Sequence, residues 1–133
     1  MSSEDGLIAI ASRHSVKETL DRLEASLRNK GIAVFARIDH ATGAASVGMT
    51  LRPTALLTFG NPKAGTPLMQ ANQTTGLDLP LKVLAWQDAA GKIWLTYTDV
   101  AWLARRHRLG ADTEGAVAAL TQGLATLAAS AAD

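Results

Sequence analysis

The sequence predicts an α+β fold in which helices cover a mostly antiparallel sheet of about five strands, and three observations favour it. Strand and helix patterns alternate unevenly along the 133 residues. Two strand segments are joined by a short turn containing glycine, which is typical of an antiparallel hairpin. The chain ends in an apolar helical segment, residues 111–133, that extends an expected core of residues 7–110. The length indicates one domain, residues 1–133, with a folded accessible surface of roughly 6,700 Å².

The first predicted elements are a strand over Leu7 to Ser12 and a helix that begins at Ser15. Ser15 and Glu18 have the spacing of a capping box, in which each side chain satisfies a backbone N–H of the first turn. An apolar stripe follows at helical steps, formed by Val16, Leu20, Leu23 and Leu27. Gly31 can end this helix in the left-handed conformation, so we expect it to pack by one face only.

Two further strands are predicted before the middle of the chain. Ile32 to Ile38 alternates apolar and other residues as a half-buried strand does, whereas Thr54 to Phe59 is nearly continuous in apolar residues and predicts a central strand. Between them, His40 to Met49 is rich in small residues, and Asp39 can cap a short helix there. A parallel pairing of the first two strands, joined by a right-handed crossover, stays open as an alternative.

The second half of the chain predicts a short helix and a hairpin. Thr66-Pro67 has the form of an N-cap followed by proline at the first helical position, so a helix is expected over Leu68 to Gln73. Strands over Lys82 to Gln87 and Lys92 to Thr98 are joined by Asp88-Ala89-Ala90-Gly91. Trp86 and Trp94 are then expected to face each other across this hairpin.

Two helices end the predicted order of elements. Asp99 caps the first, which runs to about Arg108, and Asp112 or Thr113 opens the second. The basic cluster Arg105 to Arg108 lies where the helix dipole favours cations, so we interpret it as a solvated helix end. His14, His40 and His107 lack the spacing of metal ligands, and no metal site is predicted.

Composition excludes several classes of protein. The absence of cysteine removes disulfides, thiol nucleophiles and thiolate metal sites. A net charge of +1 provides no large field for attracting nucleic acid. No secretory signal is visible, and the uncharged stretch Gly115 to Ala132 is judged too polar to cross a membrane. We therefore expect a cytoplasmic location, with neither a nucleic acid nor a membrane as partner.

The segment Phe59 to Pro67 is the first candidate for binding chemistry. It runs from a strand through a glycine-bracketed loop to a helix N-terminus, an arrangement whose free backbone N–H groups would stabilise an anion. Gly60 and Gly65 have the spacing of a phosphate loop, but Thr66 stands where that motif requires lysine. The alternative is structural, with Asn61-Pro62 as a turn and Thr66-Pro67 as a cap.

A second candidate combines Arg37, Asp39 and His40 with Arg52. If these groups converged, they would supply an imidazole, a carboxylate and two guanidiniums for carboxylate recognition or acid–base work. The alternative makes Asp39 a helix cap and His40 a surface residue.

The last helix has a column of small residues, Ala111, Gly115, Ala119 and Gly123, and carries no charge from Gly115 to Ala132. Either the helix is covered on both sides by its own domain, or it forms an oligomer interface, and we expect a homodimer interface.

The chain resembles the bacterial family called domain of unknown function 302. The resemblance covers about Leu7 to Gly110 and rests on these segments: Arg37-Ile38-Asp39-His40, Gly48, Leu51-Arg52-Pro53-Thr54, Phe59-Gly60-Asn61-Pro62-Lys63, Gly65-Thr66-Pro67-Leu68-Met69, Leu77-Asp78-Leu79-Pro80-Leu81-Lys82-Val83 and Tyr97. It implies a small α+β domain, often a homodimer, with cytoplasmic and exported members. It implies no established reaction and no catalytic residue.

Three functional classes remain open, and the first is a domain that binds a small anion without a cofactor. Its predicted site residues are Arg37, Asp39, His40, Arg52, Asn61, Lys63, Gly65 and Thr66. The second is an enzyme that uses His40 as acid or base on an anionic substrate. The third is a structural or assembly module, which needs none of these residues to converge.

Overall fold

The computed structural model describes residues 4–133 as one five-stranded antiparallel sheet with helices, so the predicted α+β class is confirmed. The strand order is β1-β5-β4-β3-β2. The strands are β1 (Leu7–Ser12), β2 (Ala33–Asp39), β3 (Thr54–Gly60), β4 (Leu81–Gln87) and β5 (Ile93–Thr98). The alternative of a parallel β1–β2 pair is wrong, because these strands lie at opposite edges and each pairs antiparallel with another strand.

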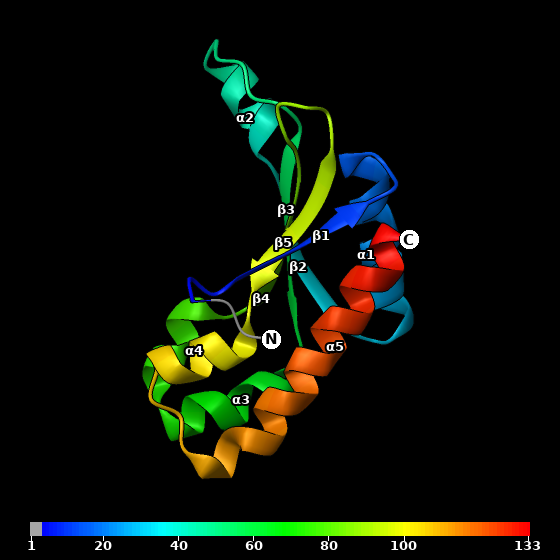
Figure 1. The fold of residues 1–133 in the computed structure, drawn as a ribbon. Coiled ribbons are helices and arrows are strands. Elements are labelled where there is room, and N and C mark those ends of the chain that lie inside the picture. Colours follow the sequence, from blue (N-terminus) through cyan, green and yellow to red (C-terminus); the bar gives the residue numbers. More distant parts are fainter. Residues whose placement is uncertain (1–3) are drawn as a thin grey trace.

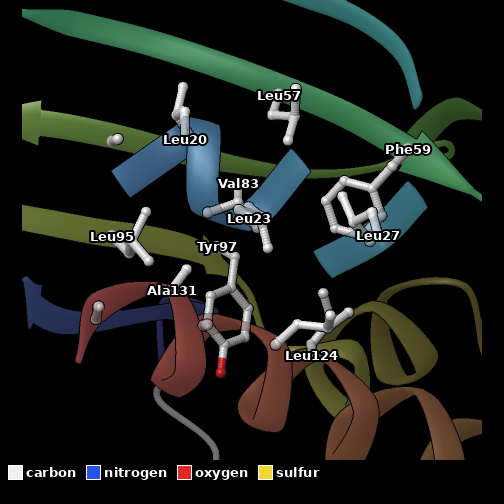
Figure 2. Packing of buried hydrophobic residues seen from close by; sticks show 14 of the residues in the cluster. Leu20, Leu23, Leu27, Leu57, Phe59, Val83, Leu95, Tyr97, Leu124 and Ala131 are labelled. Atoms are coloured by element: carbon white, nitrogen blue, oxygen red, sulfur yellow. The ribbon is translucent and has the colours of Figure 1, made fainter. Parts of the chain in front are cut away.

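Two helices, α1 (Val16–Asn29) and α5 (Glu114–Ala132), lie along the same face of the twisted sheet (Figure 1). Figure 2 shows the core between these two layers, where leucines of α1 and α5 meet the alternate side chains of the strands. Leu20, Leu23 and Leu27 are fully buried, as the sequence stripe predicts. Burial in this core raises the pKa of the Tyr97 hydroxyl.

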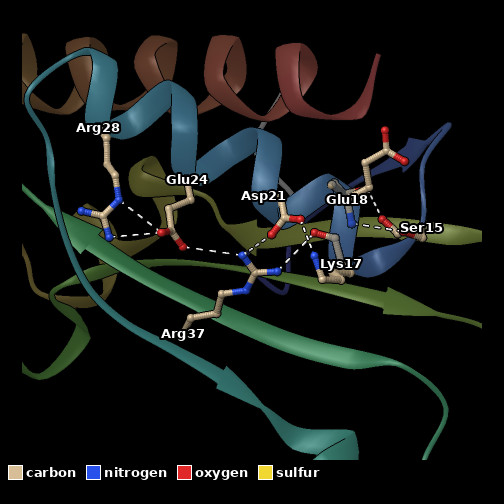
Figure 3. A network of polar contacts seen from close by, with 8 residues as sticks. Ser15, Lys17, Glu18, Asp21, Glu24, Arg28 and Arg37 are labelled. Atoms are coloured by element: carbon tan, nitrogen blue, oxygen red, sulfur yellow. Dashed lines mark hydrogen bonds and ion pairs between the residues drawn. The ribbon is translucent and has the colours of Figure 1, made fainter.

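The predicted start of α1 is confirmed, but only one half of its capping box forms. The Glu18 amide donates to Ser15 Oγ at 3.1 Å, whereas the Glu18 carboxylate lies 3.4 Å from His14 Nδ1. On the outer side of the helix, Asp21 accepts from Lys17 at 2.8 Å and from Arg37 of β2 at 2.7 Å (Figure 3). These two bonds, Lys17 first, hold the pKa of the Asp21 carboxyl below its usual range.

The connections between strands carry the remaining helices. They are α2 (His40–Ser46), α3 (Pro62–Ala71), the 3-10 helix η1 (Gln73–Asp78), α4 (Val100–Arg106) and the 3-10 helix η2 (Ala111–Thr113). The predicted start of the third helix is wrong: Asn61 caps α3, and Thr66-Pro67 lies inside it. Both Asn-Pro and Thr-Pro are good helix starts, and the earlier one is used.

The opposite face of the sheet carries no long helix. We call it the bare face, and the strand registers place these residues on it: Leu7, Ala9, Ala11, Ala36, Ile38, Thr54, Leu56, Thr58, Lys82, Leu84, Trp86, Trp94, Thr96 and Thr98. Trp86 and Trp94 stack there with ring centroids 6.4 Å apart, which confirms the predicted cross-hairpin pair.

The second half of α5 packs into the domain, and its buried residues all lie there. Leu124, Leu127 and Ala131 are buried against the sheet and α1, so part of its apolar side is covered by its own chain. By length and composition the segment Ala111–Ala132 is apolar enough to cross a membrane, which corrects the expectation that it is too polar. Core helices of soluble proteins can be equally long and apolar. In this protein, 28% of the most apolar 18-residue part of the segment is buried.

Candidate functional site: an apolar cavity beside α5

A cavity of about 470 Å³ opens where α3, η1 and α5 meet the β2–β3 edge of the sheet. Its walls are almost entirely apolar. The larger side chains that line it are Ile32, Phe35, Phe59, Met69, Leu79, Leu81, Leu120, Leu124 and Leu127. Its volume lies within the range of about 300 to 1,000 Å³ that is typical of small-molecule sites.

Small residues form part of the cavity wall. Gly60, Gly65, Gly76 and Gly123 all line it, together with Ala119. A Cβ added at Gly65 would lie 3.3 Å from Leu79 Cδ1, and one at Gly76 would lie 3.3 Å from Met69 Sδ. A Cβ at Gly123 would meet nothing within 4 Å, because it would point into open space. Two members of the small-residue column of α5, Ala119 and Gly123, therefore have a role within their own chain.

The loop that resembled an anion site uses its backbone N–H groups internally. Asn61 Oδ1 accepts from the Lys63 amide at 3.0 Å. The Asn61 carbonyl accepts from the amides of Ala64 and Gly65 at 2.9 and 3.1 Å, and Pro62 has no N–H. The first turn of α3 is thus satisfied by its own cap, and these amides are not free to cradle an anion.

The structure brings three of the eight predicted site residues to the cavity: Asn61, Gly65 and Thr66. Lys63 lies in the first turn of α3 and is exposed. Arg37 lies against α1, where it is paired with Asp21 and with Glu24 at 3.6 Å (Figure 3).

The remaining three predicted residues surround α2 and are not part of the cavity lining. Asp39 caps α2 by accepting from the Thr42 amide at 3.0 Å, and this bond holds the pKa of the Asp39 carboxyl below its usual range. His40 is the exposed first residue of that helix, and Arg52 donates to the Gln87 carbonyl at 3.1 Å. The eight residues therefore do not gather around this cavity, and His40, the residue of the enzyme hypothesis, does not line it.

A polar cluster that the sequence analysis missed ties η1 to α4. His107 is only 5% exposed, which corrects its interpretation as part of a solvated helix end. Its Nε2 contacts the Asp78 carboxylate and its Nδ1 lies 2.9 Å from Thr74 Oγ1. Arg106 also donates to Asp78, and Asn72 donates to the His107 carbonyl. No sequence spacing joins these groups, since Asp78 and His107 are 29 residues apart.

Metal binding has no visible candidate in the described part of the chain. Across residues 4–133, no group of three or more His, Cys, Asp or Glu side chains is placed so that it could hold a metal ion.

A family model described as "Domain of unknown function DUF302" matches residues 8–127. The match continues past Gly110 into α5, which corrects the expectation that the resemblance ends there. A solved structure, the uncharacterized conserved protein DUF302 from Bacillus stearothermophilus, has the same fold with a TM-score of 0.83 at 19% identity. The alignment covers 96% of this chain and 98% of that one.

Three curated relatives are named as fluoride-specific ion channels. FluC 1 of Brucella suis biovar 1 (strain 1330) and FluC 1 of Brucella abortus biovar 1 (strain 9-941) are each 49% identical to this chain over 124 residues. The match covers 93% of this chain but 49% and 46% of these relatives. The chain therefore spans about half the length of the curated relatives it matches.

Proposed function

The chain belongs to the DUF302 family, and we propose that it binds a small, mainly apolar organic molecule in the cavity between α3 and α5. The observation that carries this proposal is a cavity of about 470 Å³ that is lined by four glycines and by large apolar side chains. Burial of apolar ligand surface there would supply most of the affinity, at about 0.8 kcal/mol for each CH₂ group.

We propose that the ligand has an anionic group at one end, which keeps part of the anion hypothesis. Asn61 and Thr66 are the polar side chains of the lining. Lys63 follows the lining residue Pro62 and has no ion-pair partner within residues 4–133. An organic carboxylate would place its chain among the leucines and its charge toward solvent near Lys63. The exposed ammonium would add little affinity, of the order of 1 kcal/mol or less.

The test compares octanoate, octanol and inorganic phosphate by NMR titration. We expect octanoate and octanol to shift the amides of α3 and the middle of α5, and phosphate alone to shift none. Affinity should rise about fourfold for each added CH₂ until the cavity is full. Binding of phosphate without binding of octanoate would contradict the apolar site.

A matched pair of glycine variants locates the site. Gly123→Leu should abolish octanoate binding, because its side chain enters the cavity where a Cβ meets no atom within 4 Å. Gly115→Leu makes the same change on the same helix at a glycine that does not line the cavity, and it should leave binding intact. Equal binding by both variants would place the ligand elsewhere.

For the curated relatives, we propose that the half matched here is a folded accessory domain rather than the ion-conducting half. Two observations support this. The domain has open sheet edges at β1 and β2, which a bilayer interior does not tolerate. Within residues 4–133, the one helix long and apolar enough to span a membrane contributes Leu124 and Leu127 to the domain core. The cytoplasmic location remains part of this proposal.

Fluoride efflux from liposomes tests the second proposal. Vesicles prepared with this chain should release fluoride no faster than empty vesicles, and an alkaline carbonate wash should remove the protein from membranes. Efflux that increases with the amount of protein would overturn it.

A further inference from the structure

Strand β2 has one residue too many for its pairing with β3. Val34 and Ala36 pair with two consecutive residues of β3, so Phe35 between them has no partner in that strand. In a regular strand, neighbouring side chains point to opposite faces of the sheet. Here Val34 packs against the core and Phe35 lines the cavity on the same side of the sheet. This β-bulge therefore brings an extra side chain to the cavity.

Phe35 lies where the cavity meets the solvent. It lines the cavity and yet is 59% exposed, whereas Phe59, which also lines it, is 2% exposed. The Phe35 ring lies beside Gly60, where an added Cβ would be 3.5 Å from Phe35 Cε2. One phenylalanine thus forms part of the inner wall, and the other borders the mouth.

Protection of the sheet edge does not account for this side chain. β2 is an edge strand, and bulges in edge strands help to prevent pairing with another chain. The side chains that serve this role are charged residues and proline, whereas Phe35 adds exposed apolar surface to the edge. A ligand in the mouth of the cavity would cover that surface.

The cavity combines side chains that favour contact with an aromatic ring. The chain has two phenylalanines, and both line this cavity. Aromatic pairs in offset or edge-to-face contact stabilise a complex beyond the effect of the buried area. Met69 also lines the cavity, and a thioether makes favourable contacts with aromatic rings. These three side chains favour a ligand that carries an aromatic ring over one with an alkyl chain alone.

The polar residues of the site lie close to Phe35 along the lining. Asn61 follows Gly60 directly and lines the cavity, and Lys63 is exposed two residues further along the chain. A carboxylate directed to the solvent there would have its neighbouring atoms beside Phe35. A carboxylate attached to an aromatic ring fits this order, with an alkyl group that continues toward the buried Leu124.

We propose that Phe35 determines the specificity of the cavity, and that the ligand is an alkyl-substituted aromatic carboxylate whose ring packs against Phe35. This inference rests on the proposed function, because it assigns a ligand class to the same cavity. The bulge in β2 positions the Phe35 ring at the mouth, and the bound ligand buries it.

Two carboxylates with equal numbers of carbon atoms, 4-butylbenzoate and undecanoate, test this specificity by NMR titration. The wild type should bind 4-butylbenzoate about fivefold more tightly, and NOEs should join its ring protons to those of Phe35. Phe35→Leu should lose this preference and still bind undecanoate, whereas Phe35→Tyr should keep the preference. Because Phe35 is more than half exposed, neither substitution should prevent folding.

Leu77→Ala provides the control, because Leu77 is an exposed apolar residue of η1 that does not line the cavity. It should keep the preference of the wild type. If neither carboxylate binds the wild type, the proposed function fails and this inference fails with it. If undecanoate binds as tightly as 4-butylbenzoate, or if the preference persists in Phe35→Leu, the apolar site stands and the role of Phe35 is overturned.

Discussion

The two helical connections on either side of β3 differ in how many contacts they make with the rest of the chain. The β2–β3 connection, residues 40–53, carries α2 at one end of the sheet, and the β3–β4 connection, residues 61–80, carries α3 and η1 at the other (Figure 1). The first buries no helical residue, whereas the second buries Leu68 and Thr75. We call the β2–β3 connection the upper connection and the β3–β4 connection the lower connection, after their places in Figure 1. The lower connection also lines the cavity, so it packs against the rest of the domain.

Helix capping does not cause this difference. Asp39 caps α2 and Asn61 caps α3, each by accepting a backbone N–H bond at 3.0 Å. The lower connection has in addition an apolar anchor, Leu68, and the contact of Asp78 with His107 of α4. A local cap starts a helix, but contacts with distant segments decide whether the chain can hold it.

Removal of the apolar anchor should give the largest effect. Leu68→Ala deletes a side chain that is 2% exposed, and we expect a loss of about 3 kcal/mol in the free energy of unfolding. Val47→Ala truncates a side chain that is 70% exposed in the upper connection and should cost less than about 0.5 kcal/mol in the monomer. Urea denaturation measures both, and equal losses would remove the contrast between the connections.

The polar anchor should give an intermediate effect. Asp78→Asn removes the charge that His107 and Arg106 share, and we expect a loss of about 2 kcal/mol because His107 remains buried. Asp39→Asn is the matched change in the upper connection, where asparagine caps a helix as well as aspartate does. Its thermal midpoint should equal that of the wild type. A similar loss in both variants would mean that Asp39 also has a partner beyond its own helix.

Sequence patterns over a few neighbouring residues predicted those helices and turns whose formation depends on neighbouring residues. The stripe of α1 and the Asp88–Gly91 turn require only nearby residues, and the structure confirms both. The alternation predicted for β2 is wrong, because a register shift between Val34 and Ala36 leaves Val34 on the core side but places Ala36 and Ile38 on the bare face. The start of α3 was misplaced because Asn61-Pro62 and Thr66-Pro67 are equivalent local signals.

The cavity could be predicted only in part. Gly65 and Thr66 were singled out for their loop, yet the opposite wall comes from Leu120 and Gly123, more than fifty residues later in the chain. A pattern of apolar residues along the sequence does not show whether two distant segments will leave a cavity between them in the fold. The His107–Asp78 contact was missed for the same reason, because a basic cluster at a helix end gives no sign that one member turns inward.

A smaller, local effect is expected inside α2. Ala44→Gly should lower helix stability by about 1 kcal/mol through backbone entropy. Because α2 buries nothing in its own chain, this loss should appear as faster amide hydrogen exchange at residues 42–46 with no change in the urea midpoint of the monomer. Gln70→Gly in α3 is the control, and its cost should appear in the midpoint. A lowered midpoint for Ala44→Gly in the monomer would show that α2 contributes to the domain after all.

The smallest effect concerns pH and again distinguishes the two connections. The pKa of Asp39 is lowered from 3.8, chiefly by the bond from the Thr42 amide. A depressed pKa means that the cap is complete above pH 3.8 and is lost as the pH falls through the lower, folded value. NMR titration should therefore show the Thr42 amide shift changing with a midpoint below pH 3.8. The Lys63 amide should not titrate with it, because its cap, Asn61, carries no charge. A midpoint above 3.8 would reverse the sign and show that Asp39 does not cap α2 in solution.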